Sequence, residues 1–368
     1  MSLGAVVEES HVIVCCGSGG VGKTTTAAVL AMEAARRGRR AVVVTIDPAR
    51  RLADALGLEG LTNTPSRIDG TGEGGGEMWA MMLDTKGTFD DLVRRYAADA
   101  EQAERILANT FYRNISTALS GTQEYMASEK LYELAVEGDW DLVVVDTPPT
   151  RNALDFLEAP QRLARFLDHR LYRVLMAPTR GIVRAVNVAA QALVRSLSKV
   201  VGADVVADAM AFFAAFEGME QGFKDRAARV DELLCEEGTA FVLVASPKAD
   251  TVAEAGYFTD RLHASGIDVR ALVVNRMQPD FGDGALESSP EELRERAREL
   301  EGTALADHYT CLADARALAR GEEEHLRGIA ARIDPAPVVR VPVLPFEVSD
   351  LESLAALAEV MFERTATT

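Results

Sequence analysis

A glycine-rich loop near the start of the chain has the residue types that bind phosphate groups. It fits the pattern of a glycine, four further residues and then Gly-Lys-Ser/Thr, and it consists of Gly17, Ser18, Gly19, Gly20, Val21, Gly22, Lys23, Thr24 and Thr25. Glycines let backbone N–H groups turn toward phosphates, and a following helix adds partial positive charge. We expect Lys23 to contact the β- and γ-phosphates, the Thr24 hydroxyl to bind magnesium, and Thr25 to contact the α-phosphate. The loop therefore predicts a site for ATP and Mg²⁺.

Two aspartates are candidates to complete this site. Asp47 and Asp146 each come directly after a short β-branched run and shortly before a proline. Ligands of open α/β sheets bind at the carboxyl ends of the strands, although a simple turn-forming role is the alternative for both acids. Hydrolysis needs an acid near the metal and a group that orients water. We predict Lys23, Asp47 and Asp146 as catalytic residues, and Thr24, Asp47 and Asp146 as the residues that hold the metal.

Short apolar runs, separated by helical stretches, must position these residues. Continuous rather than alternating hydrophobicity indicates strands covered on both faces, as in a parallel sheet between helices. The sequence therefore predicts an α/β fold, a P-loop NTPase with a mostly parallel, doubly wound sheet. The predicted strands are residues 11–16, 40–46, 78–83, 141–145, 240–245, 269–274 and 339–343.

Two long sections without strand patterns lie between these runs. Both are mostly helical in pattern, so we predict a helical subdomain inserted into the nucleotide-binding domain. The helical subdomain is predicted over residues 88–138 and 152–238. The nucleotide-binding domain is predicted over residues 1–87, 139–151 and 239–368.

Composition and charge limit the range of partners. The chain has 368 residues and a net charge of −18, which argues against nucleic acid as a partner because phosphate neutralisation needs a basic surface. The most apolar helical region, residues 181–219, is interrupted by charged residues. The N-terminus lacks the pattern of a signal peptide, so we expect no integral membrane segment and a cytoplasmic location.

Four cysteines do not form a recognisable framework. Cys15 and Cys16 are adjacent in an apolar run, Cys235 and Cys311 are isolated, and no Cys-x-x-Cys occurs. Reduced thiols are therefore expected rather than disulfides.

With these motifs in place, the sequence resembles the arsenical-pump and guided-entry (tail-anchored protein targeting) ATPases. They belong to the deviant Walker A group, which includes MinD, ParA and nitrogenase iron protein. Residues 17–25 resemble their Walker A motif, residues 45–49 (TIDPA) their switch I, and residues 146–150 (DTPPT) their switch II. Residues 273–276 (VVNR) resemble the adenine-recognition segment, and residues 343–348 (VLPFEV) resemble the C-terminal loop beside the base.

The resemblance implies a cytosolic ATPase that dimerises across its nucleotide face. Asp47 would then position the attacking water, and Asn275 would hydrogen-bond adenine. Pro345 and Phe346 would pack on the base or ribose. A strand-end role for Asn275 and ordinary core packing for Pro345 and Phe346 are the alternatives.

Three departures from the family pattern bear on function. The signature lysine that reaches the partner subunit's nucleotide is replaced by Ser18, which cannot supply that charge. The targeting ATPases hold zinc with Cys-x-x-Cys, which is missing here, so no zinc site is predicted. The arsenite-stimulated pumps have two ATPase halves and a three-cysteine site, whereas this chain has one half and no such cluster. The partner is therefore expected to be a second copy or a related, lysine-bearing ATPase.

Methionines and aromatic residues are frequent in residues 171–219, where the targeting ATPases form a groove for an apolar segment. Such side chains adapt to varied apolar clients, but plain helix–helix packing explains the same pattern. The sequence thus predicts an ATP-hydrolysing dimeric switch that couples nucleotide state to a client or partner. A weakly active regulatory subunit that needs a nonidentical partner, and a chaperone for hydrophobic segments, are the alternatives.

Overall fold

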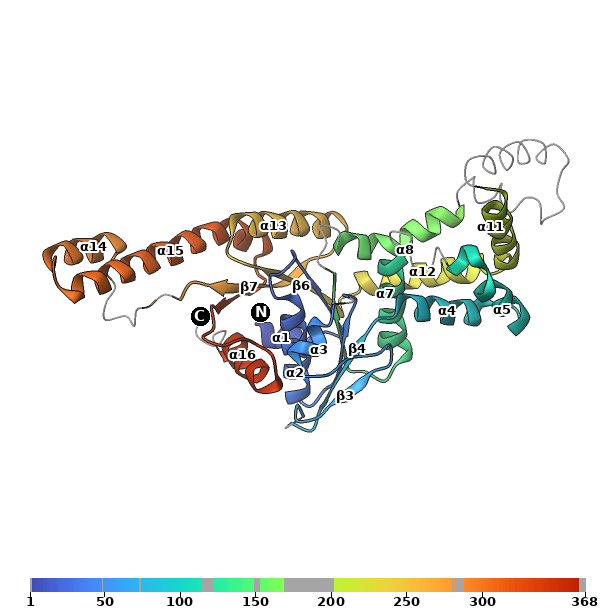
Figure 1. Ribbon diagram of the computed structural model, residues 1–368, viewed down its shortest axis with the longest axis horizontal. Helices are drawn as coiled ribbons and strands as arrows, with labels where there is room; N and C mark the ends of the chain where they lie inside the picture. The colour runs from blue at the N-terminus through green and yellow to red at the C-terminus, as the bar shows by residue number, and fades with distance from the viewer. Residues whose placement is uncertain are drawn as a thin grey trace.

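An eight-stranded sheet forms the centre of the molecule, in the strand order β3-β4-β2-β5-β1-β6-β7-β8 (Figure 1). The computed structural model describes residues 2–47, 49–72, 74–113, 122–148, 153–168, 202–279, 281 and 288–363. The strands are β1 Val12–Cys16, β2 Arg40–Thr45, β3 Ser66–Ile68, β4 Glu77–Met82, β5 Leu142–Asp146, β6 Thr239–Ala245, β7 Val269–Met277 and β8 Val338–Pro342.

All seven predicted apolar runs form parallel strands, which confirms the predicted α/β fold. β3 is the exception in both respects, because it pairs antiparallel with β4 and was not predicted. It has three residues, of which only Ile68 is buried, so it carries no apolar run that a sequence pattern could show.

Helices cover both faces of the sheet. Successive strand residues point to opposite faces, and in the central strand β1 the residues on both faces are apolar and buried. Val12 and Val14 of β1 belong to one core cluster, while Ile13 and Cys15 belong to the other. The second cluster is closed by α1 Leu3–Glu9, α2 Lys23–Arg36, α3 Arg51–Ala55 and α16 Leu351–Glu363. The first is closed near β6 and β7 by α12 Glu220–Cys235, α13 Ala249–Ala264 and α15 Ala304–Ile333.

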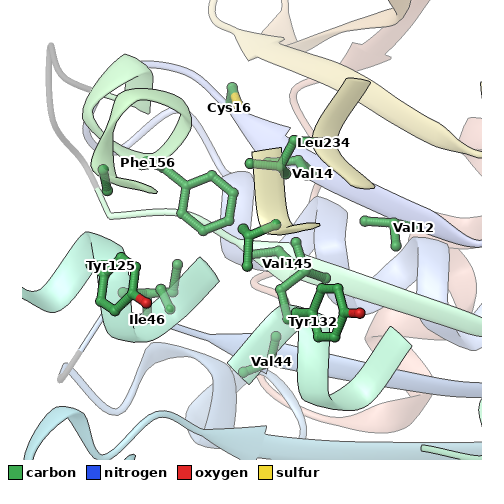
Figure 2. Packing of buried hydrophobic residues seen from close by; sticks show 14 of the residues in the cluster. Val12, Val14, Cys16, Val44, Ile46, Tyr125, Tyr132, Val145, Phe156 and Leu234 are labelled. Carbon is green, nitrogen blue, oxygen red and sulfur yellow. The ribbon is translucent and has the colours of Figure 1, made fainter. Parts of the chain in front are cut away.

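The predicted helical insertion forms a group of packed helices at one end of the molecule (Figure 1). Besides α12 it comprises α4 Thr85–Tyr96, α5 Ala100–Ala108, α7 Thr122–Tyr132, α8 Ala153–Asp168 and α11 Ala203–Phe216. At the other end α14 Pro290–Glu299 packs against α15. Figure 2 shows Phe156 of α8 directed toward Val145 of β5, with Tyr125 beside Ile46. The insertion and the sheet thus share one core cluster, and the division into two domains remains a proposal.

An aromatic cluster fills the centre of the inserted helices. Phe212 stacks on Phe216, which in turn contacts Phe223 of α12. Phe212, Phe213, Phe216 and Met219 are all buried, so in this part of the chain helix–helix packing accounts for the apolar residues. The rest of the predicted client-binding segment, residues 171–201, lies outside the described residues.

A buried ion pair joins two of these helices. Arg226 of α12 donates to Glu129 of α7 at 2.8 Å, and both side chains are almost completely buried. Tyr125 also donates to Glu129, and Arg226 lies 3.9 Å from the ring centroid of Tyr132. Arg226 reaches Glu137 as well, at 2.6 Å, at the end of the π-helical turn η1 Glu133–Glu137 that leads toward β5.

Candidate active site

The glycine-rich loop joins β1 to α2 in a conformation that only glycines permit. Gly17 has φ 149°, and a Cβ there would lie 2.0 Å from the carbonyl oxygen of Val244. Gly22 has φ 100°, and a Cβ there would lie 2.3 Å from the side-chain nitrogen of Asn275. Side chains are therefore excluded where the backbone must turn closely, and the loop is shaped as a phosphate cradle.

Lys23 begins α2 and lies folded back across the loop. Its ammonium group donates to the carbonyl oxygen of Ser18 at 2.8 Å, and the residue is only 6% exposed. Burial lowers the pKa of Lys23, while Asp146 and the two neighbouring cysteines raise it. A lysine held over the cradle by a neutral carbonyl oxygen is in position to exchange that contact for a negatively charged phosphate oxygen.

Asp146 has a buried carboxylate oxygen for which the described part of the chain provides no partner. Thr45 donates to its Oδ2 at 2.9 Å, but its Oδ1 has no hydrogen bond to any described residue. Burial raises the pKa of Asp146 to about 6, whereas Thr24, Thr45 and Lys23 lower it. An unsatisfied buried oxygen needs a ligand, and a hard cation held by Thr24 and Asp146 fits this donor set.

Asp47 lies beside this group, just beyond β2. Its backbone N–H donates to the Thr45 hydroxyl at 3.3 Å, so Thr45 connects the two predicted acids. Its carboxylate accepts from the Ala49 N–H at 3.0 Å and lies 3.3 Å from the guanidinium of Arg51. One side of Asp47 is thus fixed by the backbone, and the other faces a cation that is exposed to solvent.

The predicted adenine side of the site lies at the ends of β7 and β8. Asn275 donates to the carbonyl oxygen of Val21 at 2.9 Å, and the guanidinium of Arg276 lies 3.4 Å from the Gly20 carbonyl oxygen. Pro345 and Phe346 follow β8, and both are exposed. Core packing therefore does not explain Phe346. Its contact with a base stays a prediction, and so does that of Pro345.

The loop, Asp47 and Asp146 meet because β1, β5 and β2 are adjacent and parallel. Three contributors were not predicted from sequence. Thr45 lies within the TIDPA motif and Arg51 lies four residues after Asp47, so their closeness to Asp47 in the sequence could have marked both as site residues. No sequence pattern marks Gln123, which lies in α7 and donates to the Ile46 carbonyl oxygen at 2.8 Å across 77 residues of sequence.

The Ser18 side chain contacts an acid outside the loop, while its carbonyl oxygen accepts from Lys23. Its hydroxyl donates to the carboxylate of Glu254 on α13, and the side chain is half-buried. Within the residues that the structure describes, no group of three or more His, Cys, Asp or Glu side chains could hold a metal ion. None of the described helices has the length and hydrophobicity needed to cross a bilayer.

Comparison with known proteins decides the family. The model of the family described as "Anion-transporting ATPase" matches residues 10–299. The chain belongs to this family. The match covers both acids, the glycine-rich loop and the whole predicted insertion, and it confirms the predicted P-loop NTPase fold and the predicted enzyme class, an ATPase.

Named relatives agree with this assignment at modest identity. The chain is similar to the ATPase GET3A of Arabidopsis thaliana, with 23% identity over 86% of this chain and 74% of the relative. It is similar to the ATPase GET3 of Malassezia globosa, with 25% identity over 67% of this chain and 66% of the relative. An uncharacterized protein of Streptomyces coelicolor is 28% identical over 68% of this chain. The aligned part spans only 58% of that relative's length.

Proposed function

We propose that the protein is an ATP-hydrolysing dimeric switch, in which the nucleotide state controls the binding of a client or partner. The observation that supports this most directly is the buried, unpartnered Oδ1 of Asp146 beside Thr24 and Lys23. A structural aspartate in a core would have both oxygens satisfied. An acid kept unsatisfied next to a phosphate cradle is suited to hold a metal together with a nucleotide.

Each residue of the candidate site has a separate role in the proposed reaction. Thr24 and Asp146 hold Mg²⁺, which when bound neutralises charge on the β- and γ-phosphates. Lys23 leaves the Ser18 carbonyl oxygen and donates to the phosphates. Asp47, oriented by the Ala49 N–H and linked to Asp146 through Thr45, positions the attacking water.

Adenine recognition and assembly form the second part of the proposal. Asn275, already in contact with the loop at Val21, hydrogen-bonds the base, and Pro345 and Phe346 pack beside it. The dimer forms across the nucleotide face, either with a second copy or with a related ATPase. We place this switch in the cytoplasm, without nucleic acid as a partner.

One observation favours the alternative of a regulatory subunit that needs a lysine-bearing partner. Ser18 is engaged with Glu254 and offers no positive charge to a facing subunit. In that case the isolated protein binds ATP but turns it over slowly until the partner is added. Adding candidate ATPase partners to the purified protein and measuring phosphate release separates the two arrangements.

Replacement of Lys23 tests the proposed activity. Lys23→Ala removes the ammonium group from the cradle, so ATP affinity is expected to fall about 100-fold, and phosphate release to background. Calorimetry with Mg·ATP and a phosphate-release assay measure the two effects. Lys86→Ala is the matched control, because Lys86 is exposed on α4 and pairs with Asp90. Undiminished turnover in Lys23→Ala would contradict the proposed function.

A further inference from the structure

Arg51 is a cation beside the candidate site that the phosphate-binding motif does not include. It is the first residue of α3, and its guanidinium lies 3.3 Å from the carboxylate of Asp47, four residues earlier in the chain. The Arg51 side chain is 56% exposed, whereas that of Asp47 is 12% exposed. The charge therefore lies at the open side of the site, where a ligand can reach it.

Arg51 also belongs to the electrostatic environment of the phosphate cradle. Burial is the main cause that lowers the pKa of Lys23, and the charge of Arg51 adds a small contribution in the same direction. Burial is likewise the main cause that raises the pKa of Asp146, and the charge of Asp47 adds a small contribution. Two cations and two acids therefore influence one another across the loop, β2 and β5. The direct link between Arg51 and this group is its 3.3 Å contact with the carboxylate of Asp47.

The loop itself has a deficit of positive charge. Lys23 is the one cationic residue among residues 17–25, and position 18 carries a serine whose hydroxyl contacts Glu254. Transfer of a phosphoryl group develops charge on its oxygens, and an additional guanidinium at that point accelerates the reaction strongly. A guanidinium near the terminal phosphate would therefore add, beside Lys23 and Mg²⁺, the positive charge that position 18 does not supply.

The contacts of Arg51 leave it free to move. The Arg51 side of this ion pair is mostly exposed, so solvent screens the attraction, and the guanidinium can exchange Asp47 for a phosphate without becoming a buried, unpaired cation. α3 is only five residues long, and Arg51 is its first residue, so the side chain starts at the very end of the helix. An arginine can donate two parallel hydrogen bonds to a phosphate, which makes the exchange favourable once a triphosphate is bound.

We propose that Arg51 leaves Asp47 when ATP binds and donates to the terminal phosphate, so that it supplies within the same chain the charge missing at Ser18. The released Asp47 carboxylate then accepts a hydrogen bond from the attacking water. The water oxygen bonds to the γ-phosphorus as the bond to the bridging oxygen breaks, and the electron pair leaves with ADP. One water proton remains on the product phosphate, and the other passes through Asp47 to solvent. This inference rests on the proposed ATP hydrolysis.

Turnover of three variants tests the role of Arg51. In Arg51→Ala, kcat is expected to fall about 100- to 1000-fold while KM changes less than about threefold. Arg51→Lys keeps the charge without the planar fork and should lose about tenfold. Arg50→Ala is the control for disturbance of α3, because Arg50 is the adjacent exposed arginine and its guanidinium lies 3.5 Å from the carbonyl oxygen of Glu59, away from Asp47. It should stay within about twofold of wild type.

Binding of a transition-state mimic gives a second readout that does not depend on turnover. Arg51→Ala should lose about 100-fold affinity for ADP with aluminium fluoride and Mg²⁺, with ADP affinity unchanged. Equal kcat and equal mimic affinity in Arg51→Ala and wild type would overturn the inference, and so would an equal loss in Arg50→Ala. If Lys23→Ala instead binds ATP as tightly as the wild type does, the proposed function itself is refuted.

Discussion

The edge of the sheet that carries the candidate active site and the group of inserted helices each contain a buried carboxylate. The two carboxylates differ in their hydrogen-bond partners. Glu129 accepts from both Arg226 and Tyr125, and its charge is matched by a buried guanidinium. Asp146 accepts from Thr45 through one oxygen, and its other oxygen has no partner among the residues described in the structure. Burial raises the pKa of both acids, yet only Glu129 has a buried cation hydrogen-bonded to it.

This contrast separates a structural acid from a functional one. A buried charge with a complete set of partners holds helices together, and removing a partner leaves the charge exposed to a low dielectric. A buried charge with an incomplete set is costly in the unliganded protein and is relieved when a ligand arrives. Substitutions at the two places should therefore have opposite effects on activity and stability.

The largest expected effect is on turnover at the nucleotide edge. Asp146→Asn keeps the shape and the acceptor for Thr45 but removes the negative charge. We expect phosphate release to fall about 10³- to 10⁴-fold, which corresponds to about 4–5.5 kcal/mol in activation free energy. The free energy of unfolding, measured by urea denaturation without nucleotide, should remain equal or rise. Unfolding of this variant at low urea would break the comparison, because Asp146 would then be structural.

The converse change lies in the inserted helices. Arg226→Leu leaves Glu129 without its cation and should lower the free energy of unfolding by about 3–5 kcal/mol. Nucleotide affinity of the folded fraction should be retained. Arg95→Leu is the control, because Arg95 pairs with Glu137 at the surface and should cost at most about 1 kcal/mol. Similar losses in the two variants would remove the distinction between buried and exposed partners.

A smaller effect should appear in the dependence of stability on pH. Burial raises the pKa of Asp146 from about 4 in an unfolded chain to about 6, so the folded protein binds this proton more tightly. Its contribution to the free energy of unfolding is then full below about pH 4 and is lost as pH rises through 6, by up to about 3 kcal/mol.

Wild type and Asp146→Asn, compared by urea denaturation at several pH values, isolate this contribution. The stability difference in favour of the asparagine variant should grow between pH 4 and 7. Metal-dependent ATP affinity of the wild type should move in the opposite direction and weaken as pH falls through 6, because the ligand must be deprotonated. A stability difference that is constant over this range would show that the Asp146 proton is not coupled to folding.

Sequence patterns predicted the parts of the molecule whose residues are close in the chain. The loop at residues 17–25 and the apolar strand runs depend on local spacing, and both are found where they were predicted. Asp47 and Asp146 were placed together because parallel strands end at one edge, which is a topological rule rather than a contact. The short antiparallel strand β3 and helix α1 had no comparable local pattern.

Other features depend on contacts that no local pattern encodes. Glu129 and Arg226 are 97 residues apart, and each read singly is only a charged residue on a helical face. The missing partner of Asp146 Oδ1 becomes visible only when all neighbours are in place. Burial also had to be seen directly: Phe212 lies in the core, whereas Phe346 is exposed, although both are phenylalanines in apolar stretches.

The hydrogen bond from Gln123 to the Ile46 carbonyl oxygen has a mechanical consequence. It fastens the first turn of α7 to the backbone immediately before Asp47, and the far end of α7 continues through η1 toward β5 and Asp146. Any displacement of residue 46 beyond hydrogen-bonding reach must either pull α7 along or release it. A shift of the backbone at Asp47 is therefore transmitted to the inserted helices through the side-chain amide of Gln123.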